Sequence, residues 1–236
     1  MISKFTFHKF DQVKSTQTIA KDLIIQSKLS HGDVVIASSQ THGRGRYDRT
    51  WISPEGGVYL TARFKPERDI ADWSQVSYVV GVSLCEAIKK IDSKCLPALK
   101  WVNDILINDQ KVAGILLEIA QGSLLVGVGV NIGDSGDAGV LGTSLLSHSK
   151  AFTKAKVIEI FFERLKYNYN LWCEKGFEPI RALWVRSAIG IGTEIEVRFK
   201  ERSQKGIFIG INEIGQLQLL EGGAIKLISA GDVYFC

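Results

Sequence analysis

Short apolar runs and alternating apolar and polar positions dominate the first quarter of the chain and predict strands. They cover residues 5–10, 33–38 and 57–64. Between the first two runs, a stretch that opens at Ser15-Thr16 has its apolar residues on one face and predicts a helix. The polar, glycine-bearing stretch 39–49 predicts a loop.

Two longer segments repeat apolar residues every three or four positions, which predicts amphipathic helices. They extend over about 72–91 and about 153–172, and a shorter helix is predicted over 179–187. Between the long helices, three apolar runs follow one another across tight turns and predict an antiparallel meander. The runs are LKWVNDILI, KVAGILLEI and SLLVGVGVNIG, and the glycine-rich loop GDSGDAGVLG separates the last of them from the second helix.

The pattern changes after Gly190-Ile191-Gly192. Five short strands then follow, parted by polar or glycine turns, which predicts a small barrel. We place a domain boundary near Ala188, which divides the chain into 1–187 and 188–236. The whole pattern is typical of an α+β fold with a small β-domain at its end.

Composition narrows the class of protein. The chain has 236 residues, of which 45% are hydrophobic and 23% charged, with a net charge of +4. These values exclude disordered and collagen-like chains, and the weak charge argues against sequence-independent nucleic-acid binding. No apolar run of about eighteen residues and no signal-peptide centre is present, so we expect a cytoplasmic protein without membrane contact. The four cysteines lack the spacing of a zinc site or a disulfide framework.

The segment Gly43 to Trp51, GRGRYDRTW, is the most informative part of the chain. It carries Arg44, Arg46 and Arg49 on a loop whose glycines allow unusual backbone angles. Guanidinium forks match the oxygens of phosphates and carboxylates, and the tryptophan offers a flat face to a purine. On composition alone, a solvated basic loop or an RNA-contacting tip explains the segment equally well.

Two further segments carry polar side chains next to strands. KWVND (100–104) and KVAGILLE (111–118) flank an Asn-Asp turn, and this hairpin would bring Asp104 and Lys111 onto adjacent strands. Taken singly, each is explained as a turn or solvated residue. In GVGVNIG (127–133) the glycine spacing does not fit a dinucleotide fingerprint, so close approach of a ligand or backbone is the better interpretation, with Asn131 placed to address a metal or a phosphate.

Taken together and in this order, GRGRYDRTW, KWVND, KVAGILLE and GVGVNIG resemble the signature set of biotin protein ligases. Ser15-Thr16-Gln17 and Gln40 fit that family's pocket, and the C-terminal segment resembles its SH3-like domain. The resemblance implies a class II synthetase-like fold, with a mixed, largely antiparallel sheet, flanking helices and a small SH3-like β-barrel. Because Ser15 falls almost at the chain start, we expect the short form without an N-terminal DNA-binding repressor domain.

The resemblance implies an ATP-dependent ligase that forms biotinyl-5′-AMP with Mg²⁺ and transfers biotin to a lysine of a biotin carboxyl carrier protein. It assigns Lys111, Arg46 and Arg44 to catalysis and Asp104 and Asn131 to the metal. Biotin contacts are expected from Ser15, Thr16, Gln17, Gln40, Gly43, Arg44, Gly45, Arg46, Lys111, Gly114 and Ile115. ATP contacts are expected from Arg44, Arg46, Arg49, Trp51, Asn103, Asp104, Lys111 and Asn131.

Two departures and two alternatives stay open. Val102 stands where the family commonly has proline, and Tyr47-Asp48 stand where it has a further glycine, which puts the loop conformation in question. A lipoate or octanoate ligase would have a similar fold, and a non-catalytic nucleic-acid-binding module would use the basic loop and the barrel. Related ligases are often dimers, so a homodimer is also left open.

Overall fold

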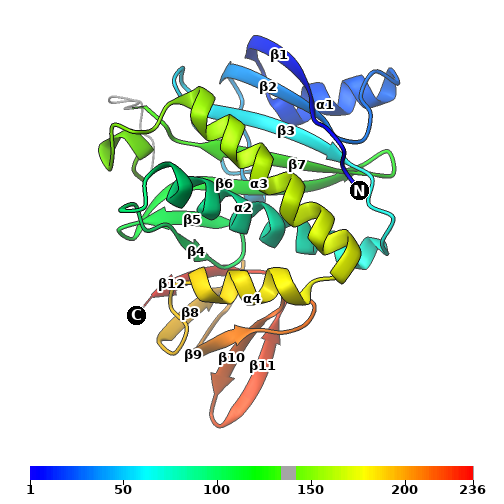
Figure 1. Cartoon of the computed structure of the whole chain (residues 1–236). Helices are drawn as coiled ribbons and strands as arrows, with labels where there is room; N and C mark the ends of the chain where they lie inside the picture. Colours follow the sequence, from blue (N-terminus) through cyan, green and yellow to red (C-terminus); the bar gives the residue numbers. More distant parts are fainter. Residues whose placement is uncertain (134–141, 236) are drawn as a thin grey trace.

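The computed structural model describes residues 1–133 and 142–235, which form two β-sheets with helices around the larger one (Figure 1). Most of the predicted glycine-rich loop GDSGDAGVLG, and Cys236, lie outside the described residues. The larger sheet has the strand order β1-β2-β3-β7-β6-β5-β4. Its strands are β1 (Thr6–Val13), β2 (Asp33–Gln40), β3 (Val58–Phe64), β4 (Ala98–Lys100), β5 (Asp104–Ile107), β6 (Gln110–Ala120) and β7 (Ser123–Val130).

The larger sheet is mixed and largely antiparallel, as predicted. Only its first pair, β1 with β2, is parallel; this pair is joined by a crossover through the helix α1 (Thr16–Ile25). The other pairs are antiparallel and include the β5-β6-β7 meander. The start of α1 lies beside the end of β2, where the backbone N–H of Thr16 donates to the Gln40 side chain.

Two layers of helix cover opposite faces of this sheet. Neighbouring residues of β2 show the division: Val35 packs with α1, whereas Val34 belongs to the main core. On the main-core face lie α2 (Val76–Ile91) and α3 (Lys154–Lys175), which cross in front of the sheet in Figure 1. Alternate residues of each strand point to these two faces. On the second face α1 contacts mainly β2, β3 and β7, so the part over β6 is not covered by this helix.

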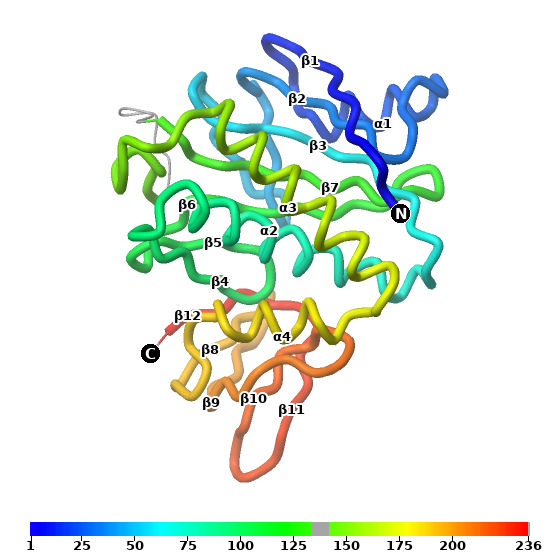
Figure 2. The backbone as a smooth tube through the Cα atoms, viewed as in Figure 1, coloured from blue at the N-terminus to red at the C-terminus, as the bar shows by residue number. Residues whose placement is uncertain are grey.

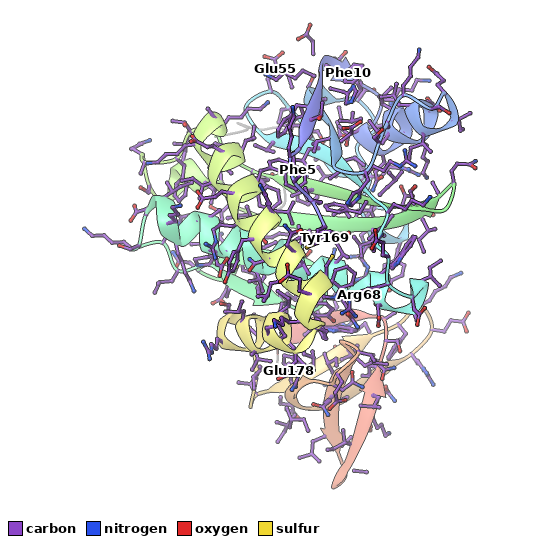
Figure 3. The ribbon with its side chains drawn as sticks, turned by 45° about the vertical axis from the view of Figure 1, so that its right-hand side comes forward. Phe5, Phe10, Glu55, Arg68, Tyr169 and Glu178 are labelled. Carbon is purple, nitrogen blue, oxygen red and sulfur yellow. The ribbon has the colours of Figure 1, made fainter. Side chains whose placement is uncertain are left out.

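The α3 layer is anchored by aromatic side chains. Tyr169 of α3, labelled in Figure 3, is buried with its ring centroid 4.7 Å from that of Phe64 on β3. Arg68, also labelled there, stacks its guanidinium 5.3 Å from the ring of the fully buried Trp172. These contacts join the helical layer to the sheet as one rigid support.

One predicted strand is wrong. LKWVNDILI is not a single strand but two, β4 and β5, which pair with each other so that Lys100 lies opposite Asp104. The chain turns back over 101–103, where the Trp101–Val102 peptide bond is cis. An apolar residue stands at position 101 because this side chain is buried against the second sheet, and it does not continue a strand. The first predicted long helix also begins as a 3-10 helix over Ile70–Gln75 before α2.

The second sheet is antiparallel with the order β11-β10-β9-β8-β12, and α4 (Glu178–Ser187) lies between it and the first sheet (Figure 2). Its strands are β8 (Glu194–Arg198), β9 (Ser203–Ile211), β10 (Leu217–Glu221), β11 (Ala224–Ile228) and β12 (Asp232–Phe235). All five predicted strands are therefore present. The division at 187/188 stays a prediction, because buried residues of both sheets form one continuous core.

An aromatic junction holds the second sheet in place. Trp101 donates from Nε1 to the hydroxyl of Tyr78, 3.0 Å away, and to the carbonyl of Gly215, 3.2 Å away. The Tyr78 hydroxyl donates to the same carbonyl. Burial raises the pKa of the Tyr78 phenol, so the hydroxyl keeps the proton that it donates. Among the described residues, no helix is long and apolar enough to cross a membrane.

The junction can be tested with two glycines of positive φ on the second sheet. A Cβ at Gly215 (φ +87°) would lie 2.7 Å from the Tyr78 ring, whereas a Cβ at Gly222 (φ +57°) meets nothing within 4 Å. We expect Gly222→Ala to lower the free energy of unfolding by about 1 kcal/mol through backbone strain alone. Gly215→Ala should cost about 1–3 kcal/mol more through overpacking, measured by urea unfolding. Equal losses for the two variants would contradict the role given to the junction.

Candidate functional site

A cavity of about 330 Å³ opens on the α1 face of the larger sheet. Its floor comes from β6 and β7, one end from the start of α1 and β2, and its cover from the loop 43–51, called the arginine loop below. Asp232 of the second sheet reaches its rim. Of the sequence-predicted site residues, all but Gly43 line it: Ser15, Thr16, Gln17, Gln40, Arg44, Gly45, Arg46, Arg49, Trp51, Asn103, Asp104, Lys111, Gly114, Ile115 and Asn131.

The glycines of the floor make room for one large side chain. Gly114 of β6 and Gly129 of β7 lie opposite each other, and a Cβ at either position would lie within 3.0 Å of the Trp51 ring. The glycines of the GVGVNIG segment thus admit the Trp51 side chain, not the ligand or backbone that the sequence suggested. Its indole Nε1 is buried and has no hydrogen-bond partner among the described residues, so the cavity contains a free donor.

The closed end of the cavity is a network of amide and hydroxyl groups. Gln40 accepts at Oε1 from the backbone N–H of Thr16, 2.8 Å away, and from the Thr16 hydroxyl, 3.2 Å away. Its Nε2 donates to Ser53 Oγ over 2.8 Å, and Thr61 donates to Thr16 Oγ1 over 2.9 Å. Ser53 and Thr61 were not predicted, since an isolated serine or threonine in a strand carries no signal. Gly43 lies behind this network, where a Cβ would meet Ser53 Oγ at 2.7 Å.

Gln17 offers the cavity an acceptor. The side chain is buried, and its Nε2 donates to the carbonyl of Leu116, 3.2 Å away. Its Oε1 is buried without a hydrogen-bond partner in the described part of the chain. A buried, unpaired amide oxygen is costly, so the cavity is suited to a ligand that brings an N–H group to this end.

Lys111 lines the cavity beside Trp51 and Asp104. Its Nζ is 2.6 Å from Oδ1 of Asp104 and 5.1 Å from the centre of the Trp51 ring. The predicted hairpin does bring these two residues onto adjacent strands, β5 and β6. Asn103, just before β5, donates from Nδ2 to the Ile115 carbonyl, 2.8 Å away, which orients its Oδ1. The lysine is therefore held by one carboxylate and one aromatic face.

The arginine loop takes a conformation that glycine favours, although it has none at its tip. Tyr47 has a φ of +55° and Asp48 a φ of +58°. Two adjacent residues with side chains in this left-handed region carry local backbone strain. The Tyr47 hydroxyl accepts from Nη2 of Arg46, 2.9 Å away, and the ring lies 4.8 Å from that guanidinium. Tyr47 thus helps to position Arg46.

Each arginine of the loop has a partner within the protein. Arg44 lies 3.1 Å from Oε2 of Glu118, and Arg46 donates to Oδ1 of Asn103 over 3.2 Å. Arg49 is paired with Asp232, and this hydrogen bond raises the pKa of the guanidinium above its ordinary value. Asp232 is separated from the loop by more than 180 positions. Asp232 could not be predicted from the sequence, because no local pattern links the loop to the second sheet.

Asn131 sits where β7 ends. Its Nδ2 donates to the carbonyl of Thr143 over 3.2 Å, and its backbone N–H donates to the carbonyl of Val112. The Asn131 side chain lines the cavity, as does that of Asp104. Within 1–133 and 142–235, no group of three or more His, Cys, Asp or Glu side chains is close enough to hold a metal ion.

Comparisons with known proteins agree with this geometry. The model of the Biotin/lipoate A/B protein ligase family matches residues 9–134. A Biotin--[acetyl-CoA-carboxylase] ligase of Paracoccus denitrificans is 33% identical, over 94% of this chain and 98% of its own length. The Bifunctional ligase/repressor BirA of Bacillus spizizenii is 31% identical, over 94% of this chain and 72% of its own. A biotin protein ligase of Aquifex aeolicus, in complex with biotin and ATP, superposes with a TM-score of 0.86 at 28% identity, covering 97% of both chains.

The contact between Asp232 and the arginine loop can be tested by proteolysis. Asp232→Asn removes the charge that holds Arg49, so we expect trypsin to cleave after the loop arginines about three- to tenfold faster, as expected for a lost partly buried ion pair. Glu194→Gln, which makes the same change of charge at an exposed position of β8, is the matched control and should cleave at the rate of the unaltered protein. Equal cleavage rates for both variants would show that Asp232 does not hold the loop.

Proposed function

The chain belongs to the Biotin/lipoate A/B protein ligase family, and on that premise we propose that it activates biotin with ATP and transfers it to a lysine of a biotin carboxyl carrier protein. The single observation that carries this proposal is one cavity with an amide network at its closed end and Lys111, Arg44 and Arg46 at its open end. Such a cavity suits a ligand with a polar ring, an apolar body and an anionic tail.

The reaction has two steps. A carboxylate oxygen of biotin attacks the α-phosphorus of ATP, which forms biotinyl-5′-AMP and releases pyrophosphate. The acceptor lysine then attacks the acyl carbon, and AMP leaves. Neither step needs a covalent intermediate with the enzyme, so the work of the site is positioning and neutralisation of charge.

We place the biotin ring at the closed end. Gln17 Oε1, the unpaired acceptor, would receive a ureido N–H, and Thr16, Ser15 and Gln40 would complete the ring contacts. Leu116 and the glycine floor at Gly114 would lie along the apolar body. Ile115 would contribute its backbone, since its side chain packs toward α2 on the other face of the sheet. The support for this placement is that it pairs a buried oxygen that otherwise stays unsatisfied.

The phosphates belong at the open end. Two anions, the biotin carboxylate and the α-phosphate, must approach each other, and Lys111 lies where it can face both. Arg44 and Arg46 would turn from their internal partners to these groups, and Arg49 would reach the outer phosphates. Trp51, beside Lys111, is our candidate for the adenine contact, and Asn103 orients Arg46.

Asp104 and Asn131 fit a Mg²⁺ ion by chemistry. Both line the cavity and both offer oxygen ligands, the kind that Mg²⁺ prefers. This ion commonly takes one or two protein ligands and completes its shell with water and substrate phosphates, which agrees with the small donor set. When bound, it would neutralise phosphate charge, while Lys111 keeps its own contact with Asp104.

The two alternatives are not favoured. The similar proteins named above are biotin ligases, whereas a lipoate or octanoate ligase would leave the closed amide network without a partner. A nucleic-acid-binding module would not require Lys111 and Asn131 inside a cavity.

Exchange of labelled pyrophosphate into ATP tests the proposed function. We expect exchange that depends on biotin and on Mg²⁺ and is absent with lipoate, because only biotin carries a ureido ring for the closed end. Exchange with lipoate alone would identify the other branch of the family. No exchange with either acid, using folded protein, would overturn the proposal.

Lys111→Ala tests the placement of charge at the open end. Loss of a cation aimed at the reacting phosphate should slow biotin-dependent exchange by about 100-fold or more, while the affinity for ATP changes less than about tenfold. The control is Lys226→Ala, which removes a lysine that is also paired with a carboxylate, Glu221, but on the surface of the second sheet. An unchanged exchange rate in Lys111→Ala would remove its role.

A further inference from the structure

A second hollow, of about 340 Å³, lies on the outer side of the arginine loop. Its walls are the loop residues 44–48 and the β6 residues Leu116, Leu117 and Glu118. Arg44, Gly45, Arg46 and Leu116 line both this hollow and the cavity described above. A narrow piece of the loop therefore separates the reaction site from the outer surface.

One face of β6 leads from the cavity to this hollow. Gly114, Leu116 and Glu118 alternate along the strand and point to the same side of the sheet. Gly114 lies at the cavity floor against Trp51 and Lys111, Leu116 lines both spaces, and Glu118 lines only the outer one. The row ends in a carboxylate where a group coming from outside would enter.

Glu118 holds two cations. Its Oε2 is 3.1 Å from Arg44 and its Oε1 is 3.3 Å from Lys21 of α1. Under the proposed function, Arg44 turns inward to the carboxylate and phosphate of the bound substrates. That movement leaves Oε2 of the partly buried Glu118 carboxylate without its cation. This is costly unless another cation takes the position of Arg44.

We propose that Glu118 binds the ammonium group of the acceptor lysine, and that it becomes free to do so when Arg44 turns to the adenylate. This inference rests on the proposed function and adds to it a subsite for the second substrate. The lysine, delivered beside Leu116, loses a proton to solvent, and its nitrogen then attacks the acyl carbon. The N–C bond forms, the bond from the acyl carbon to the phosphate oxygen breaks, and AMP leaves with the electron pair, while the attached nitrogen loses a second proton to solvent and becomes the amide.

The subsite also explains an order of steps. Before the adenylate forms, Arg44 occupies Glu118 and blocks the ammonium site electrostatically. After it forms, the same arginine serves the phosphate. Lys21 stays beside the other oxygen, so only the oxygen that Arg44 leaves becomes available.

The experiment compares the two half-reactions in Glu118→Gln. We expect biotin-dependent pyrophosphate exchange within about twofold of the unaltered protein, and transfer of biotin to a purified biotin carboxyl carrier domain slowed by about tenfold or more. Hydroxylamine is a neutral nucleophile that needs no ammonium site. It should convert the bound biotinyl-5′-AMP to the hydroxamate and AMP at an unchanged rate. Retained exchange in the same sample shows that the variant is folded.

Two further variants sharpen the result. Glu159→Gln, an exposed glutamate of α3 on the opposite layer, is the matched control and should leave transfer unchanged. Lys21→Gln removes the second cation from Glu118, so transfer should stay at least as fast as in the unaltered protein.

Unchanged transfer in Glu118→Gln, or an equal loss of exchange, transfer and hydroxylamine release, would overturn the subsite. Absence of exchange in the unaltered protein would instead overturn the proposed function, so the two failures are distinct.

Discussion

Repulsion among four cations around one cavity is the constraint on which the site depends. Arg44, Arg46, Arg49 and Lys111 all line a space of about 330 Å³. Like charges that share a cavity repel one another, so the gathered cations need opposite charges beside them. The protein compensates with carboxylates from three different places: Asp104 on β5, Glu118 on β6 and Asp232 on β12. These carboxylates hold the cations ready until substrate anions replace them.

The position of the central lysine follows from packing. Gly114 and Gly129 lie opposite each other in the β6–β7 pair and admit the Trp51 ring, and that ring supports Lys111 from one side. Side chains at either glycine would push the indole out and with it the wall of the cavity. The second sheet contributes through Asp232 and is held by the Tyr78, Trp101 and Gly215 junction, so distant parts of the fold meet at the loop.

Much of the site could be predicted because its chemistry lies in short, local segments. The hairpin that joins Asp104 to Lys111 spans few residues, so alternation and a turn signal were enough to place them on adjacent strands. The error at LKWVNDILI has the opposite cause. Trp101 is buried against the second sheet at the turn between β4 and β5, and a run of apolar residues cannot distinguish such a buried turn from a continuous strand. Ser53, Thr61 and Asp232 carry no local signal at all.

The sequence by itself determined which elements form, which residue types are available for phosphate and carboxylate chemistry, and which family the motifs resemble, because hydrophobic period and motif spacing are local properties. Only the tertiary structure decided which partner each charged side chain has. Arg49 meets Asp232 across more than 180 positions because the second sheet lies beside the first. Arg44 meets Glu118 across 74 positions because the loop between β2 and β3 folds back toward β6 of the same sheet. It also decided that Tyr47 and Asp48 adopt a turn that glycine favours, since the contacts around the loop, including those of Arg46, outweigh the local backbone preference.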